Sequence, residues 1–456
     1  MKKCFKQKYL VSLLVFLLMI GSIQNPVTAA EPIDINASAA ILVDAETGKI
    51  LYEENSKTVL GIASMTKMMT EYITLEAIKE GKVKWDQKYT VSPELSKMSH
   101  DEELSNVYLR VEESYTVKDL YAAMAIESAN AATIAIAEVI AGTEANFVKM
   151  MNEKAKELGL EQYKFVNSTG LNNREMLKHF PEVVGDPDEE NVMSANDVAA
   201  LAYHLIKDFP EVLETSSIPE AIFAKGTRDE FVMDNWNWSL DGYKDLAKDY
   251  PNYQQFVYEG MDGLKTGSTL FAGFNFTGTA ERNGQRFISV VMNTSSQSQR
   301  FIETRKIMDY AFNNFAKKEI VPKHFQVKDS KTVPVIKGKE KQVKIYTKEA
   351  VNLVVSSGEE GNYQPVLVLD KEKINKNGEL TAPVKKGEKV GYLTIEAKNA
   401  DKLGFVSEEG QNKMRVDVIA AEDVEKSNWF VLMMRGIGHF FGDLWGGISS
   451  TVKGWF

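Results

Sequence analysis

Ser64 and Lys67 are the first residues in this chain whose types and spacing could do chemistry. They stand where a helix should begin, and a spacing of three places the hydroxyl and the amine on one face, one turn apart. A serine becomes a nucleophile when a base removes its proton, and lysine can be that base if burial or a nearby positive charge keeps its amine neutral. Free N–H groups at a helix start could also stabilise an oxyanion. The spacing alone is not specific, because Ser450 and Lys453 repeat it in a segment that needs no catalytic role.

Ser128 and Asn130 form a second pair, at a break between two alanine-rich stretches with helical character. A hydroxyl and an amide two residues apart in such a turn can point into one cleft. There Ser128 could relay a proton, and Asn130 could bond the substrate and hold Lys67. Helix capping is the competing interpretation for Ser128, and it is the simpler one for Ser194 in the similar Ser-Ala-Asn run.

The triplet Lys265-Thr266-Gly267 occurs once in the chain. A lysine on an edge strand beside the nucleophile could lower the pKa of Lys67 and attract a substrate carboxylate. Gly267 would let a substrate backbone approach the strand, and the N–H of Ser268 could complete an oxyanion hole. On an ordinary surface strand the same lysine would carry no function.

The elements that must position these groups are strands at both ends of one region and helices between them. A hairpin is expected from residues 39–43 and 50–53, and a helix follows with apolar positions between Met68 and Leu75. Helices begin at the Thr116 and Ser194 capping patterns. Strands 272–281 and 285–292 flank a turn, and a last helix covers residues 301–315. This order predicts an α+β domain with an antiparallel sheet and a helical subdomain.

The composition changes after this region. Short β-rich runs at residues 343–346, 351–355, 365–369 and 390–395 predict a small all-β domain without a catalytic cluster. We therefore divide the chain into residues 1–30, a catalytic domain at 31–322, a β-rich domain at 323–421 and a terminal helix at 422–456. We interpret the β domain as a spacer or docking module.

The last segment is amphipathic. On a helical wheel its apolar residues fall within about 80° of Phe430. They are Met434, Ile437, Phe440, Phe441, Leu444, Trp445, Ile448, Val452, Trp455 and Phe456. Such a helix fits lying in a membrane interface better than spanning the bilayer. The alternative is a helix packed on its own β domain.

The first thirty residues predict export. Four lysines precede an apolar run from Leu10 to Ile20, and small residues follow up to Ala30, which is the pattern of a cleaved signal peptide. An uncleaved anchor is the alternative. The only cysteine, Cys4, lies within this leader, so the mature chain has no thiol chemistry and no disulfide.

Composition excludes other classes of protein. The net charge of -10 argues against nucleic-acid binding, which needs clustered Lys and Arg. The five histidines are scattered without ligand spacing, so neither a metal site nor another cofactor is expected. Ser64 also lacks the glycine-flanked elbow of a Ser-His-Asp hydrolase.

Taken together, the three motifs in this order resemble those of the penicillin-recognising serine enzymes, and within them the D-alanyl-D-alanine carboxypeptidases of the low-molecular-mass penicillin-binding proteins. The resemblance covers nearly the whole chain. It implies that Ser64 is acylated, that Lys67 accepts its proton, and that Ser128 and Asn130 form the second motif. Lys265 and Thr266 would face the substrate carboxylate, and Arg300 is a further candidate for that contact. Many relatives have a proline two places before the serine, where this chain has Ile62.

The resemblance implies an enzyme that removes the terminal D-Ala from peptidoglycan stem peptides at the outer face of the bacterial cytoplasmic membrane. β-Lactams would inhibit it covalently, because no Glu-x-x-Leu-Asn run, the pattern expected around a β-lactamase deacylating glutamate, occurs between Asn130 and Lys265. Transpeptidation remains open, since only the acyl acceptor differs. A non-catalytic wall-binding module is a further alternative, which the completeness of the three motifs disfavours.

Overall fold

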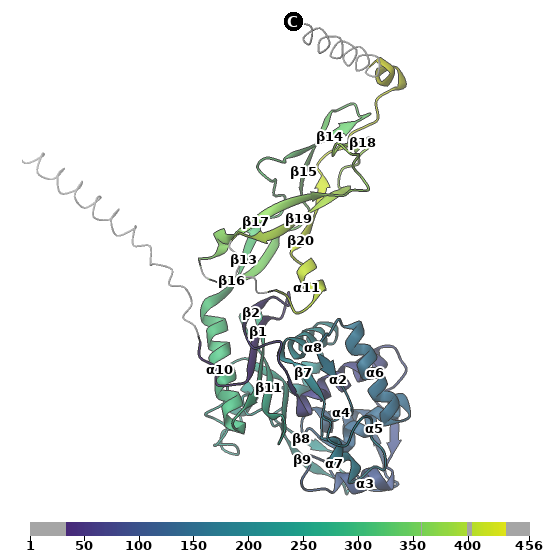
Figure 1. The fold of residues 1–456 in the computed structure, drawn as a ribbon, viewed down its shortest axis with the longest axis vertical. Coiled ribbons are helices and arrows are strands. Elements are labelled where there is room, and N and C mark those ends of the chain that lie inside the picture. Colours follow the sequence, from purple (N-terminus) through teal and green to yellow (C-terminus); the bar gives the residue numbers. More distant parts are fainter. Residues whose placement is uncertain (1–32, 357, 399–403, 435–456) are drawn as a thin grey trace, which may run out of the picture.

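An antiparallel sheet of five strands organises the first part of the chain in the computed structural model, which describes residues 33–356, 358–398 and 404–434 (Figure 1). Its strand order is β10-β11-β12-β1-β2, so segments far apart in sequence lie side by side. The strands are β1 (Ala39–Asp44), β2 (Ile50–Glu54), β10 (Met261–Thr269), β11 (Gly273–Arg282) and β12 (Gln285–Thr294). The predicted signal peptide lies outside the described residues, as does the chain beyond residue 434.

Both faces of this sheet are covered. Alternate residues of a strand point to opposite faces, and accordingly Ala39, Ile41 and Val43 belong to a core shared with the helical region. Ala40 and Leu42 belong to a separate core beneath α10 (Gln297–Asn314). β1 is therefore apolar at almost every position, which explains why its sequence shows no polar alternation.

The helical region follows the predicted order. Its helices are α2 (Lys67–Lys79), α3 (Pro93–Ser99), α4 (Val117–Ala125), α5 (Asn130–Ala141), α6 (Glu144–Glu157), α7 (Asn173–Leu177), α8 (Ala195–Asp208) and α9 (Val212–Ser216). Thr116 and Ser194 accept hydrogen bonds from the N–H groups of Asp119 and Asp197, so both predicted caps are confirmed. The break at Ser128 is also confirmed, because α4 ends at Ala125 and α5 begins at Asn130.

Two element boundaries differ from the prediction. Helix α10 begins at Gln297, four residues before the expected start, because Ser296 caps it by accepting the N–H of Gln299. Ser64 lies in a 3₁₀ turn, η1 (Ala63–Thr66), which precedes α2. Ala63 enters that turn with a φ of 47°, a conformation that its sequence does not announce.

Smaller sheets connect the helices. They are β3 (Val59–Gly61) with β7 (Val192–Ser194) and β6 (Tyr163–Lys164), β4 (Lys88–Thr90) with β5 (Ser114–Thr116), and β8 (Glu220–Phe223) with β9 (Phe231–Asp234). A 3₁₀ turn, η2 (Asp241–Lys244), precedes β10. No single helix of the described segments is long and apolar enough to cross a membrane, and only α5 with α6 passes that test as a pair, bent by 81°.

The C-terminal domain is built of strands around its own apolar core, as predicted. Its sheets have the orders β17-β19-β20-β15-β14-β18 and β13-β16. The strands are β13 (Phe315–Val321), β14 (Thr332–Ile336), β15 (Gln342–Thr347), β16 (Val351–Ser356), β17 (Tyr363–Leu369), β18 (Leu380–Thr381), β19 (Lys389–Ala397) and β20 (Arg415–Ala420), with η3 (Glu360–Asn362) and α11 (Glu408–Asn412) between them. The predicted domain boundary at residue 322 lies directly after β13, although this strand pairs with β16 of the C-terminal domain.

The two domains meet at the turn between β1 and β2. The N–H of Val406 donates to the carbonyl of Gly48 at 2.9 Å, and the N–H of Ile50 donates to the carbonyl of Gly404 at 3.0 Å. Lys49 Nζ donates to the Tyr363 hydroxyl at 2.6 Å. The described part of the C-terminal domain ends with helical residues 429–434.

Candidate active site

Lys67 is the centre of a hydrogen-bonded group between the helical region and the sheet. Its side chain is fully buried at the start of α2. Its Nζ lies 2.9 Å from Ser64 Oγ, 2.9 Å from Asn130 Oδ1 and 2.9 Å from the carbonyl oxygen of Thr169. The structure therefore brings Ser64, Lys67 and Asn130 together, as their motifs predicted.

The surroundings of Lys67 disfavour its charged form. Burial holds its pKa well below the usual value, and the nearby positive charge of Lys265 lowers the pKa further. The carboxylate of Glu71 has the opposite, smaller effect. A lysine with this balance can be neutral near neutral pH, which is the condition that a general base requires.

Ser128 and Asn130 flank the start of α5. Asn130 is anchored to the segment that follows α3, because its Nδ2 donates to the carbonyl of Ser105 at 3.0 Å. Ser128 has a φ of 60° and is buried, and its Oγ has no hydrogen-bond partner among the described residues. A buried hydroxyl without a partner is costly, so it indicates a place where another molecule is expected.

The Thr169 carbonyl that faces Lys67 was not found from the sequence. Asn167 Oδ1 accepts hydrogen bonds from the N–H groups of Thr169 and Gly170, at 3.1 and 2.7 Å. Gly170 has a φ of 88°, and a Cβ there would lie 1.9 Å from the carbonyl oxygen of Ala63. Only glycine permits this approach, which locks the loop against the turn that carries the nucleophile candidate.

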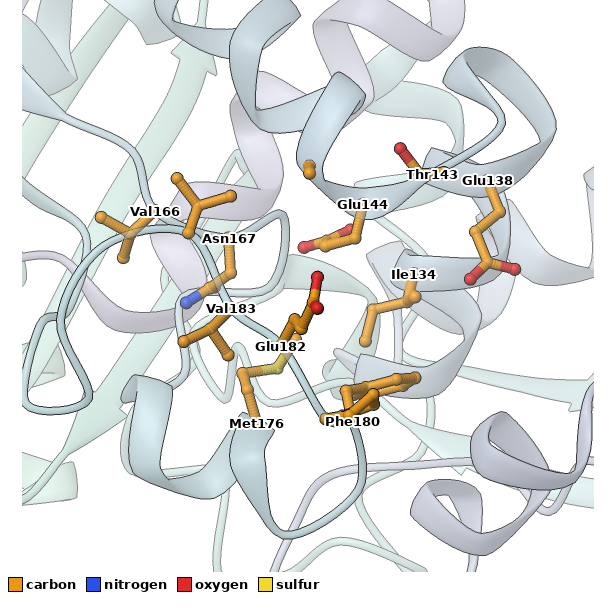
Figure 2. Close-up of a pocket in the computed structure, with 13 residues that line it drawn as sticks. Ile134, Glu138, Thr143, Glu144, Val166, Asn167, Met176, Phe180, Glu182 and Val183 are labelled. Carbon is orange, nitrogen blue, oxygen red and sulfur yellow. The ribbon is translucent and has the colours of Figure 1, made fainter.

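A cavity of about 340 Å³ lies behind this loop, between α5, α6 and α7. Glu144 borders it, and its carboxylate accepts the N–H of Ser168 at 2.6 Å and the Ser168 hydroxyl at 2.9 Å. Figure 2 shows the side chains of Glu144 and Glu182 ending in this space, with Ile134 and Phe180 around it. Burial raises the pKa of Glu144 to about 7. Glu144, at the border of this cavity, thus holds the loop from the side opposite Lys67.

Strand β10 closes the other side of the site as the edge strand of the sheet. A Cβ at Gly267 would lie 3.0 Å from the backbone nitrogen of Ser64 and 2.6 Å from the carbonyl oxygen of Ile62. The predicted edge position of the strand is confirmed. The backbone that approaches Gly267 is the chain's own turn at residues 62–65, whereas the approach of a substrate backbone stays a prediction. Thr266 is buried beside it, and Ser268 is exposed at the mouth of the site.

Lys265 and Arg300 are buried cations without an ion-pair partner in the described chain; 3% of Lys265 and 2% of Arg300 is exposed. Burial is the main cause that lowers the pKa of Lys265 to about 8; the charge of Glu71 opposes this shift and that of Arg300 adds to it. Burial also lowers the pKa of Arg300, to about 9. Both groups stay cationic at neutral pH, and neither has the direct ion-pair contact within the described chain that buried cations normally require.

Glu71 is a second residue that the sequence analysis missed. It is buried on α2, one turn after Lys67, and burial raises the pKa of its carboxyl group while Lys265 and Lys67 oppose the rise. Its position four residues after a candidate base was a usable signal, because residues at that spacing share a helix face. Tyr121 also faces Glu71, and its hydroxyl has no partner in the described residues.

The remaining sequence patterns have structural roles or are outside the described residues. Ser194 caps α8, as the simpler interpretation held. Ser450 and Lys453 lie beyond residue 434. Within the described ranges, no group of three or more His, Asp or Glu side chains is arranged to hold a metal ion.

A Ser–Lys pair at the junction of a helical region and an antiparallel sheet, opposite an edge strand, is the architecture of the penicillin-recognising serine enzymes. Comparison with known proteins identifies the family within this class of enzymes. Residues 25–296 match the family model described as D-alanyl-D-alanine carboxypeptidase. Residues 315–426 match the model of the penicillin-binding protein 5 C-terminal domain. The chain belongs to the D-alanyl-D-alanine carboxypeptidase family of serine peptidases.

Individual relatives agree. The chain is 33% identical over 351 residues to D-alanyl-D-alanine carboxypeptidase DacF of Bacillus subtilis, covering 77% of this chain and 79% of DacF. The crystal structure of a peptidoglycan synthesis regulatory factor (PBP3) from Streptococcus pneumoniae is 34% identical, with a TM-score of 0.68 over 86% of this chain and 100% of the other. Cefotaxime-bound penicillin-binding protein D2 from Listeria monocytogenes is 32% identical, with a TM-score of 0.50 over 62% and 99%. These relatives and the family model confirm the predicted activity, that of a serine-type D-alanyl-D-alanine carboxypeptidase.

Proposed function

We propose that Ser64 forms an acyl-enzyme with peptidoglycan stem peptides that end in D-Ala-D-Ala, and that Lys67 takes the serine proton. The hydrogen bonding of Lys67 carries this proposal. A neutral amine has two N–H groups and one lone pair. Asn130 Oδ1 and the Thr169 carbonyl can only accept, so they take the two N–H groups. The lone pair is then left for the Ser64 hydroxyl at 2.9 Å.

The bonds and protons balance in two steps. Ser64 Oγ bonds to the carbonyl carbon of the penultimate D-Ala, and the peptide bond to the last D-Ala breaks. The proton from Ser64 passes through Lys67 and the Ser128 hydroxyl to the leaving amine. Water then hydrolyses the ester, which releases the shortened peptide and restores the serine. The unpartnered Oγ of Ser128 supports the relay role, and Asn130 holds both Lys67 and the substrate.

Lys265, Thr266 and Arg300 form the substrate-carboxylate side of the site in this proposal. The two cations are buried and unpaired within the described chain. Their desolvation is compensated when the terminal carboxylate of the substrate arrives between them. β10 would bind the backbone of the substrate, because it is an edge strand and an extended peptide can add to its free edge. Gly267 lets the strand pack closely against the turn that carries Ser64, and the N–H groups of Ser64 and Ser268 would bind the oxyanion.

β-Lactams would acylate the same serine and inhibit the enzyme, in line with the cefotaxime-bound relative. The acyl-enzyme could also pass its acyl group to an amine, which would be transpeptidation. Incubating the enzyme with a D-Ala-D-Ala peptide, with and without an amine acceptor, separates the two reactions by their products. We expect hydrolysis to dominate, and mainly amide product would favour the transpeptidase.

Ester formation at Ser64 is tested by intact mass. The mature protein should gain the mass of one benzylpenicillin, and Ser64→Ala should abolish the gain. Ser194→Ala is the matched control, because Ser194 belongs to the similar motif that caps α8. An unchanged mass of the wild-type protein would contradict the mechanism.

We also propose that the mature enzyme is held at the outer face of the cytoplasmic membrane by its C-terminal helix after cleavage of residues 1–30. Trp429, Phe430, Met433 and Met434 support this proposal, because these large apolar residues are exposed where the described chain ends. Deleting residues 427–456 should release the protein from membranes. Continued attachment would instead favour an uncleaved N-terminal anchor.

A further inference from the structure

The proposed function, on which this inference rests, needs the Thr169 carbonyl to accept one of the two N–H groups of Lys67. If this carbonyl turned away, that N–H could donate to Ser64 Oγ, and the lone pair would no longer face the hydroxyl. The carbonyl belongs to the planar peptide unit between Thr169 and Gly170, so its direction is set by whatever holds the residues around it. Asn167 holds the N–H groups of both residues of that unit.

Ser168, the residue before Thr169, is held on two sides. Its carbonyl accepts Thr70 Oγ1 at 2.9 Å, from the turn of α2 that follows Lys67. On the other side Glu144 accepts both donors of Ser168: Oε1 accepts the N–H at 2.6 Å, and Oε2 accepts the hydroxyl at 2.9 Å. One carboxylate therefore fixes the main chain and the side chain of Ser168 together.

Neither helix capping nor ion pairing accounts for Glu144 in the described chain. It is the first residue of α6, but the cap of this helix is Thr143, whose side chain accepts the N–H of Asn146. No cation acts on its carboxyl group, and the neighbouring charge is the carboxylate of Glu138. Glu144 borders the cavity of about 340 Å³ (Figure 2). Because the loop has this space beside it, no packed side chain would replace the hold of the carboxylate if it were removed.

We propose that Glu144 is a positioning residue for the catalytic base. Through Ser168 it holds the Thr169 carbonyl against Lys67 Nζ, which keeps the lone pair of this amine directed at the nucleophile. Glu144 acts on the reaction only through this loop. Its two hydrogen bonds are what matters, rather than its charge, since a carboxamide can accept the same N–H and donate to the same hydroxyl.

The test separates the acylation step from the binding of the drug. Acylation by benzylpenicillin at increasing concentration gives the limiting rate constant k2 and the concentration K for half of that rate. For Glu144→Ala we expect k2 to fall about 30-fold to 100-fold, because a loop displaced by about 1 Å misplaces the base. K should stay within about threefold of wild type, since Lys265 and Arg300 belong to β10 and α10 instead. A mere loss of folded enzyme would lower the final acylated amount and leave k2 unchanged.

Glu144→Gln should restore k2 to within about threefold of wild type, since the amide keeps both hydrogen bonds to Ser168. Glu138→Ala is the matched control. It removes a carboxylate that lines the same cavity but accepts the Tyr89 hydroxyl, and it should keep the wild-type k2. If Glu144→Ala does not fold, Ser168→Ala decides. Its k2 should fall about fivefold, because one of the two hydrogen bonds to Glu144 remains.

A k2 within about threefold of wild type in Glu144→Ala, or an unchanged k2 in Ser168→Ala, would overturn the inference. A Glu144→Gln variant as slow as Glu144→Ala would overturn it too, because the effect would then belong to the charge. An equal loss in Glu138→Ala would do the same, because it would assign the effect to the cavity as a whole. If benzylpenicillin still acylates wild-type Ser64 in these cases, the proposed function stands without the inference.

Discussion

Replacing Gly267 by alanine tests whether the spacing between β10 and the turn η1 sets the reaction rate. The new Cβ would lie 2.6 Å from the carbonyl oxygen of Ile62, 2.9 Å from the nitrogen of Met65 and 3.0 Å from the nitrogen of Ser64. All three atoms belong to the backbone, so no flexible side chain can move aside. Ordinary carbon-to-oxygen contacts begin near 3.3 Å, and the strand must therefore retreat by about 0.7 Å.

The kinetic cost follows from that displacement. A misplacement of about 1 Å at reacting atoms costs on the order of a hundredfold. For Gly267→Ala we expect acylation by benzylpenicillin to slow by about 30-fold to 100-fold, or about 2 to 2.7 kcal/mol in the activation barrier. The assay is the second-order rate constant of acylation, with thermal unfolding measured in parallel, since overpacking also costs about 1–3 kcal/mol of stability.

Gly278→Ala provides the control for overpacking alone. Gly278 lies on the neighbouring strand β11, and its added Cβ would meet only side-chain atoms of Phe276 and Thr304, at 3.0 Å and beyond. These side chains can adjust, so this variant should lose some stability but acylate within about threefold of wild type. Acylation by Gly267→Ala at a rate within threefold of wild type would refute the reasoning.

The pH dependence of acylation provides the remaining predictions. The rate constant should rise as Lys67 loses its proton, at a pH well below the usual range of lysine, and should fall near pH 8 as Lys265 becomes neutral and stops attracting the carboxylate. Lys265→Arg should move the alkaline decline to higher pH, because arginine keeps its charge. Glu71→Gln removes the negative charge that raises the pKa of both lysines, so both limbs should move to lower pH. Limbs that stay in place in Glu71→Gln would show that this carboxylate does not face the lysine pair.

Patterns that are local in sequence were predicted well. The caps at Thr116 and Ser194 are confirmed, because a cap is decided by a side chain and an N–H three residues away. The turn between β11 and β12 is confirmed for the same reason, since Asn283 and Gly284 both adopt positive φ, at 54° and 73°. The 3₁₀ turn at Ser64 was not predicted, because packing against Gly170, more than a hundred residues later, constrains it.

The sequence by itself determined which residue types this enzyme possesses and their order, and hence its family. Only the tertiary structure decided what surrounds Lys67. The Thr169 carbonyl reaches its amine across 102 positions, and Lys265 approaches from the far end of the domain. These contacts depend on how the edge strand and the 167–170 loop close against α2. No local spacing encodes that closure, because the free energy that drives it comes from burying the shared core as a whole.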